Sequence, residues 1–171
     1  GNELHTLGQS LPEGCIYDSN RYSLMGALAR LGVEVIDLGL VPDDPARLAA
    51  TLDEAIARAD VVLTSGGVSV GDADYTKDLL ASRGEVAFWK LAIKPGRPMA
   101  FGRIGDAVLF GLPGNPVAVM VTFLAFVRPA LLRMMGSTRT APPLLRATST
   151  EAIRKKPGRT EYQRGILSTA A

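Results

Sequence analysis

A glycine-rich segment in the first half of the chain constrains its fold more than any other feature. It reads Thr64-Ser-Gly-Gly-Val-Ser-Val-Gly-Asp-Ala-Asp74, follows the apolar run Val61–Leu63 and precedes a helical pattern over 75–83. A strand, a glycine-rich turn and a helix in this order commonly hold a phosphate, because backbone N–H groups and the helix N-terminus face the anion. The spacing matches neither a Walker loop nor a dinucleotide fingerprint. The residues of the predicted anion site are Ser65, Gly66, Gly67, Ser69 and Gly71.

Two carboxylates, Asp72 and Asp74, end this segment. One of them could cap the following helix, and a cap needs only one carboxylate. A carboxylate beside a bound phosphate normally needs a cation between them, and oxygen ligands suit Mg²⁺. The pair therefore predicts a magnesium site at Asp72 and Asp74.

Composition excludes several classes of protein. The net charge of +2, from 19 basic and 17 acidic residues, is too balanced to indicate a nucleic-acid or membrane-surface partner. The single cysteine, Cys15, forms no internal disulfide, which fits a reducing compartment and predicts a cytoplasmic protein. We expect no membrane span, because the apolar stretch 117–127 is interrupted by Thr122 and followed by Arg128-Pro129. The first residue is Gly rather than Met, which predicts a fragment or a processed product.

Predicted helices and strands alternate along most of the chain. Helical patterns cover 21–31, 45–59, 75–84 and 116–135, and strand patterns cover 33–38, 61–64, 86–94, 99–103 and 108–112. This order predicts a three-layer α/β/α fold with a mostly parallel sheet. Ligands of such sheets bind outside the carboxyl ends of the strands. We therefore expect loops that are remote in sequence to converge on one crevice.

The composition changes after Gly136. Residues 137–143 are rich in Thr and Pro and are interpreted as a linker. Residues 144–171 are too few to fold alone. The predicted organisation is an α/β domain over 1–136, the linker 137–143, and the truncated start of a C-terminal β domain over 144–171.

A basic group and a second glycine-rich turn extend the predicted site. Lys90 and Lys94 are four residues apart, so on a regular strand they would share a face. Together with Arg97 they form either a solvated edge or a cationic cradle for an oxyanion. The turn Gly111-Leu-Pro-Gly-Asn-Pro116 is either only a helix start, with Asn115 as its cap, or a second anion contact.

Other polar residues have simple structural explanations. Glu3 and Asp43 are each a single carboxylate near a predicted strand end, and Arg164 is most simply surface charge. His5 is the only histidine, and no Ser/His/Asp or Cys/His arrangement accompanies it. The residues alone predict an enzyme for a phosphorylated ligand, and the reaction does not follow from their spacing.

Three motifs in order resemble the MoeA-type molybdopterin molybdenumtransferases, the family of the gephyrin C-terminal domain. They are the segment 64–74, the turn Lys94-Pro-Gly-Arg-Pro98 and the turn 111–116. The resemblance extends to Gly1-Asn-Glu-Leu4, Tyr17-Asp-Ser-Asn20 and the tail 157–165. It implies insertion of molybdenum from molybdate into adenylated molybdopterin, with release of AMP and assistance from Mg²⁺. It also implies a homodimer in the full-length protein.

The resemblance implies roles for individual residues. Acidic or basic active-site positions fall on Glu3, Asp43, Asp74, Lys90 and Lys94. Substrate-binding positions fall on the first glycine-rich segment, the basic turn, the second turn and the tail. They are Ser65, Gly66, Gly67, Ser69, Gly71, Asp72, Arg97, Pro113, Gly114, Asn115, Pro116 and Arg164.

The sequence also departs from that family. Asn2 stands where the family usually has Asp, Ala118 stands where many members have Ser, and Arg97 replaces a common Lys. Family members run to about four hundred residues in four domains, so the resemblance implies that this fragment is inactive alone. Two alternatives remain: a molybdopterin adenylyltransferase of the same fold, whose loop typically reads Gly-Gly-Thr-Gly, and a non-catalytic scaffold module.

Overall fold

A computed structural model describes residues 2–67 and 75–168, and its centre is a four-stranded sheet. The strand order is β3 (Val61–Ser65), β7 (Ala107–Leu112), β6 (Pro98–Ile104) and β4 (Gly84–Lys90). Strand β3 runs parallel to β7, whereas β6 is antiparallel to both β7 and β4. The turn at Gly105-Asp106 joins β6 to β7 as a hairpin, and these strands correspond to the predicted strand patterns 99–103 and 108–112.

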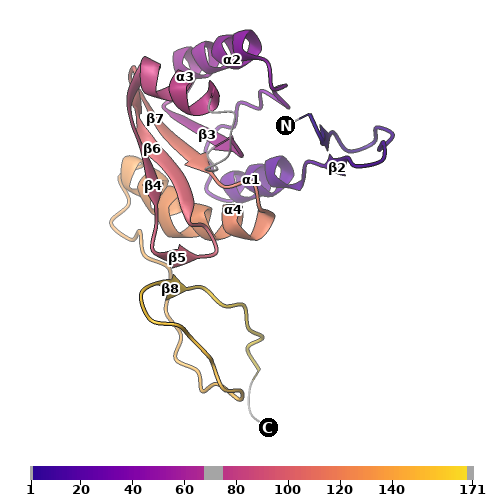
Figure 1. Cartoon of the computed structure of the whole chain (residues 1–171). Helices are drawn as coiled ribbons and strands as arrows, with labels where there is room; N and C mark the ends of the chain where they lie inside the picture. Colours follow the sequence, from indigo (N-terminus) through magenta and orange to yellow (C-terminus); the bar gives the residue numbers. More distant parts are fainter. Residues whose placement is uncertain (1, 68–74, 169–171) are drawn as a thin grey trace.

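Helices cover both faces of this sheet (Figure 1). Helices α2 (Pro45–Arg58) and α3 (Tyr75–Arg83) pack on one face around Leu109 of β7. The other face is covered by α1 (Ser19–Ala29) and by a continuous helical run formed by α4 (Pro116–Thr122), η1 (Phe123–Val127) and α5 (Arg128–Met134). Alternate residues of β7 enter the two cores, as the two-residue period of a strand requires. The α/β class and its three layers are confirmed.

Side-chain caps start helices α1, α2 and α4. The Asp18 carboxylate accepts a hydrogen bond from the N–H of Arg21 at 3.1 Å, and that of Asp44 accepts from Arg47 at 2.7 Å. The Asn115 side chain accepts from the N–H groups of Val117 and Ala118 at 3.0 and 3.2 Å. These acceptors satisfy N–H groups that have no partner within the helix.

The predicted strand over 33–38 is wrong. This segment follows α1, but the structure assigns it no strand pairing. A cavity of about 920 Å³ lies between it, α1, α2 and β3. Its β-branched residues favour an extended backbone, yet a strand also needs a hydrogen-bonded neighbour, which a local pattern does not specify. Among the described residues, parallel pairing is found at β3–β7 and in two short pairs, β1 (Leu4–His5) with β2 (Ile16–Tyr17) and β5 (Ile93–Lys94) with β8 (Thr160–Glu161).

The apolar stretch 117–127 is part of a longer helical run in the structure. By length and composition alone, Pro116–Met134 is long and apolar enough to cross a membrane. Its inward side chains, Val119, Phe123 and Val127, are buried against the sheet. One face of the run therefore packs into the core of the domain. The π-helical turn η1 ends immediately before Arg128-Pro129, where Pro129 has no N–H to donate.

The tail after Gly136 is mostly exposed and runs away from the α/β domain (Figure 1). Among the described residues, the tail pairs with a strand of the domain at β5–β8, to which each strand contributes two residues. The division into a linker over 137–143 and a partial β domain over 144–171 stays a prediction.

Candidate functional site

The two glycine-rich segments meet at the carboxyl ends of the parallel strands β3 and β7. Ser65 and Leu112, the last residues of these strands, are partners in the sheet register. The N–H of Gly66 donates to the carbonyl of Leu112 at 3.0 Å. A Cβ placed on Gly114 would lie 3.9 Å from the Cα of Gly66. The predicted convergence of these two loops is therefore confirmed for the residues that the structure describes.

Backbone conformation explains the glycines of the first loop. Gly66 and Gly67 have φ angles of +87° and +68°. Residues that carry a side chain rarely adopt this left-handed backbone region, so glycine is the natural residue at both positions. Ser69, Gly71, Asp72 and Asp74 lie outside the described residues. Within 2–67 and 75–168, no group of three or more His, Cys, Asp or Glu side chains could hold a metal ion.

The second loop combines a rigid entry with a helix cap. Pro113 is buried, whereas Gly114, Asn115 and Pro116 are exposed. The Asn115 side chain is the N-cap of α4. The helix-start interpretation of this turn is therefore confirmed, and its exposed backbone still borders the first loop.

Asn20 joins the two loops, and sequence reasoning missed this role. Its side-chain Nδ2 donates to Ser65 Oγ at 2.8 Å and to the carbonyl oxygen of Gly114 at 2.7 Å. The local pattern Asp18-Ser-Asn20 offers several N-caps for a helix, and Asp18 fills that role. The signal that could have found Asn20 was the resemblance, which included the segment 17–20.

The basic group lies at the same edge of the sheet as the two loops. Lys90, at the end of β4, is the register partner of Pro98, and Ala100 of β6 is the partner of Gly111. Because β6 and β4 are antiparallel neighbours, the end of β4 and the start of β6 meet where β7 ends. Lys90, Lys94 and Arg97 are exposed there.

The predicted placement of Lys90 and Lys94 on one regular strand is wrong. Lys90 and Lys94 do not share the face of one strand, because β4 ends at Lys90 and a separate strand, β5, begins at Ile93. The N–H of Leu91 donates to the carbonyl of Arg97 at 2.7 Å, which folds the chain into a turn. Gly96, with φ of +101°, is buried in this turn against the side chain of Thr122.

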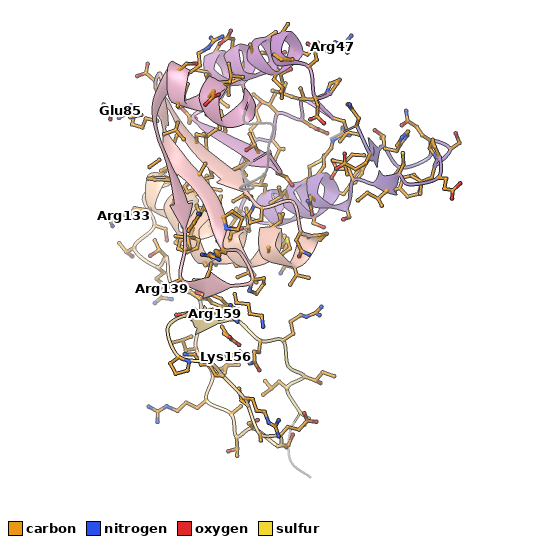
Figure 2. All side chains as sticks on the ribbon, viewed as in Figure 1. Arg47, Glu85, Arg133, Arg139, Lys156 and Arg159 are labelled. Carbon is orange, nitrogen blue, oxygen red and sulfur yellow. The ribbon has the colours of Figure 1, made fainter. Side chains whose placement is uncertain are left out.

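The tail strand β8 holds the Lys94 turn from outside. The N–H groups of Thr160 and Tyr162 donate to the carbonyls of Ala92 and Lys94, both at 2.8 Å. Glu161 between them is only 10% exposed and accepts a hydrogen bond from Arg159 Nε at 3.0 Å. Figure 2 shows Arg159 where the tail meets the domain.

The charge of Glu161 is stabilised by its basic neighbours. The hydrogen bond from Arg159 lowers the pKa of Glu161, and the charge of Lys94 lowers it further. Sequence reasoning missed Glu161, because only the pairing of β8 with β5 brings it to Lys94. Arg164, which the resemblance placed in the site, is exposed further along the tail.

The acidic N-terminal positions lie on neighbouring loops. The N–H of Asp43 donates to Asn2 Oδ1 at 3.3 Å, so the loop before β1 contacts the loop before α2. This contact brings the chain around Glu3 to Asp43, and both side chains are exposed. Two of the predicted acidic positions therefore lie on loops that contact each other.

An ion pair anchors the segment 33–39, which leads to the loop before α2, to helix α1. Arg21 donates to both carboxylate oxygens of Asp37, the shortest contact being 2.6 Å. These hydrogen bonds lower the pKa of Asp37 and raise that of Arg21, although desolvation opposes both shifts. Asp37 also accepts from the N–H of Gly39 at 3.0 Å, so it fixes the turn that leads toward Asp43.

Comparison with known proteins shows the family of this chain. The family described as "Probable molybdopterin binding domain" matches residues 1–133. The chain belongs to this family. A protein from Haemophilus influenzae named molybdopterin molybdenumtransferase is 47% identical over 167 residues, which are 97% of this chain and 41% of that protein. The chain thus spans less than half of that relative's length.

Solved structures of molybdopterin-binding domains have the same fold. The molybdopterin biosynthesis MoeA protein from Pyrococcus horikosii has a TM-score of 0.70 and 39% identity, over 79% of this chain and 33% of that one. The molybdopterin biosynthesis enzyme MoaB from Thermus thermophilus has a TM-score of 0.55 and 23% identity, over 71% of this chain and 87% of that one. The second likeness shows the fold alone.

Proposed function

We propose that this chain is the molybdopterin-binding part of a molybdopterin molybdenumtransferase, which inserts molybdenum from molybdate into adenylated molybdopterin and releases AMP. One observation carries the proposal: both glycine-rich loops lie at one edge of the sheet, beside Lys90, Lys94 and Arg97. A dianion such as molybdate needs cationic groups to gather it. A relative named for this activity, at 47% identity, supports the same reaction.

The residues at this edge suit cleavage of a phosphoanhydride. The N–H groups of the first loop and the exposed backbone of the second would bind the adenylyl phosphate. Lys90, Lys94 and Arg97 would neutralise the charge of molybdate and of the pterin phosphate. The exposed carboxylates of Glu3 and Asp43 would orient water or the leaving group.

Magnesium and a second subunit belong to the same proposal. Asp72 and Asp74 would hold Mg²⁺, and the ion would supply charge neutralisation at the phosphate when bound. We also propose that the intact protein is a cytoplasmic homodimer. Neither alternative function is better supported, since the MoaB likeness supports only the fold.

The proposal is tested by turnover of the intact native protein that carries this sequence. Adenylated molybdopterin and molybdate are supplied, and AMP release and formation of molybdenum cofactor are measured. We expect consumption of the adenylated pterin, with a loss of at least tenfold in kcat/KM for Lys94→Ala. Formation of adenylated molybdopterin instead would favour the adenylyltransferase. Peptide binding, with no effect of Asp74→Ala on cofactor synthesis, would favour the scaffold.

A chain of these 171 residues tests how much of the protein the reaction needs. Because the chain spans 41% of its Haemophilus relative, we expect it to turn over little by itself. Activity near that of the intact protein would contradict this expectation. The same assay with equal molar amounts of the two proteins makes the comparison.

A further inference from the structure

Asn20 contacts both loops of the site through one nitrogen atom. It lies in the first turn of α1, 45 residues before Ser65 and 94 residues before Gly114. The Gly114 carbonyl can only accept a hydrogen bond, so it fixes Nδ2, and not Oδ1, on this side of the Asn20 amide. Asp18 already caps α1, and the Asn20 amide is therefore not needed for helix capping.

The hydrogen bond from Asn20 also sets the direction of the Ser65 hydroxyl. Ser65 Oγ accepts from Asn20, and among the described residues it donates to no acceptor of the chain. A hydroxyl has one hydrogen, which then points away from the donor it accepts from. Ser65 is an exposed residue, and its hydroxyl hydrogen remains available to an acceptor outside the chain, such as a phosphate oxygen.

One buried polar atom lies at the same junction. Asn20 Oδ1 is buried and has no hydrogen-bond partner among residues 2–67 and 75–168. Burying unpaired polar atoms costs stability. If the contacts of Asn20 served folding alone, this loss of stability would bring no benefit.

We infer that Asn20 is a positioning residue, which holds the two glycine-rich loops together and turns the Ser65 hydroxyl toward a bound nucleotide phosphate. This inference rests on the proposed function and names a residue to which that proposal gave no role. Asn20 acts through Ser65 and Gly114 and needs no contact with the ligand itself.

Two substitutions separate this role from simple packing. Asn20→Ala removes both hydrogen bonds. Asn20→Asp has nearly the same shape, but its carboxylate would repel the Gly114 carbonyl and would accept the Ser65 hydrogen that the ligand needs. The inference therefore predicts that Asp is at least as damaging as Ala, whereas packing alone predicts that Asp resembles the wild type.

The test uses the intact native protein, with AMP as the binding probe in calorimetry and adenylated molybdopterin as the substrate. We expect Asn20→Ala to raise the Kd for AMP roughly tenfold. Ser65→Ala should have a similar effect. The double variant Asn20→Ala with Ser65→Ala should bind AMP no more weakly than the worse single variant, because the loss of Asn20 already removes the orientation of the Ser65 hydroxyl. Ser19→Ala, an exposed change on the same turn, is the matched control and should bind like the wild type.

The possible outcomes are distinguishable. Wild-type binding by Asn20→Asp, or additive losses in the double variant, would overturn the inference while leaving the proposed function intact. A lower melting temperature of Asn20→Ala with an unchanged Kd would also overturn it. If the wild-type protein binds no AMP and consumes no adenylated pterin, the proposed function fails, and the inference fails with it.

Discussion

At the scale of a single residue, Asn115 has a structural role as a helix cap and a proposed role in ligand binding. Its side chain accepts from two N–H groups at the start of α4, and its exposed backbone borders the first glycine-rich loop. Loss of such a cap costs about 1 kcal/mol. We expect Asn115→Ala to lower the free energy of unfolding by about that amount, measured by urea denaturation.

Asn115→Asp separates the two roles. Aspartate caps a helix as well as asparagine does, so stability should be retained. Its negative charge would repel an anionic ligand, and AMP binding should weaken. If Asn115→Asp bound AMP like the wild type, the second loop would not lie near the phosphate.

Gly96 fits its site for two reasons, its backbone angle and its contact with the helical run. Its φ is +101°, and an added Cβ would lie 2.7 Å from Thr122 Cγ2. Left-handed backbone costs about 1 kcal/mol, and overpacking a buried contact costs about 2 kcal/mol more. We expect Gly96→Ala to destabilise the protein by about 3 kcal/mol in chemical denaturation.

Gly136 provides the matched control for Gly96. Its φ is +84°, but an added Cβ meets nothing within 4 Å. Gly136→Ala should therefore cost only about 1 kcal/mol. Equal losses for the two variants would mean that the contact of Gly96 with Thr122 contributes nothing.

The ion pair between α1 and the segment 33–39 predicts a pH dependence at the scale of elements. The pKa of Asp37 is lowered from its ordinary 3.8 by the Arg21 hydrogen bonds. A lowered folded-state pKa gives stability that is fully present above pH 3.8 and is lost as pH falls through the folded-state value. The Arg21 and Asp37 side chains are 24% and 26% exposed, and such a pair contributes about 1 kcal/mol at most.

Asp37→Asn tests this dependence. We expect it to be less stable than the wild type at pH 7 and to approach the wild type as pH falls below 4, because protonation removes the same pair. Unfolding free energies between pH 2 and 7 measure it. Asp53→Asn, which breaks the more exposed pair with Arg83, is the control and should have a smaller effect at neutral pH. A gap between Asp37→Asn and the wild type that persisted at pH 2 would contradict the account.

Local signals predicted most helices and strands, and non-local pairing explains the failures. The caps Asp18, Asp44 and Asn115 are readable because each acts within three residues of itself. The segment 33–38 has the composition of a strand, but only a neighbouring strand could make it one. Likewise, the end of β4 at Lys90 depends on the register with Pro98.

The site was predictable where a motif directly follows a predicted strand. The loops at Gly66 and Gly114 follow visible strands, and the α/β order placed both at one edge. Asn20 and Glu161 could not be found in this way, because their partners lie far along the chain or in a different strand. The predicted magnesium ligands Asp72 and Asp74 fall outside the described residues and stay a prediction.

At the scale of the whole molecule, the central claim is that two loops remote in sequence form a single anion site at one edge of the sheet. The most direct measurement is a titration of the isotope-labelled intact protein with AMP, followed by the chemical shifts of backbone amides. The account predicts shifts at Gly66, Gly67, Gly114 and Asn115 that saturate with one common Kd. Shifts at only one loop, or at two loops with different Kd values, would contradict it.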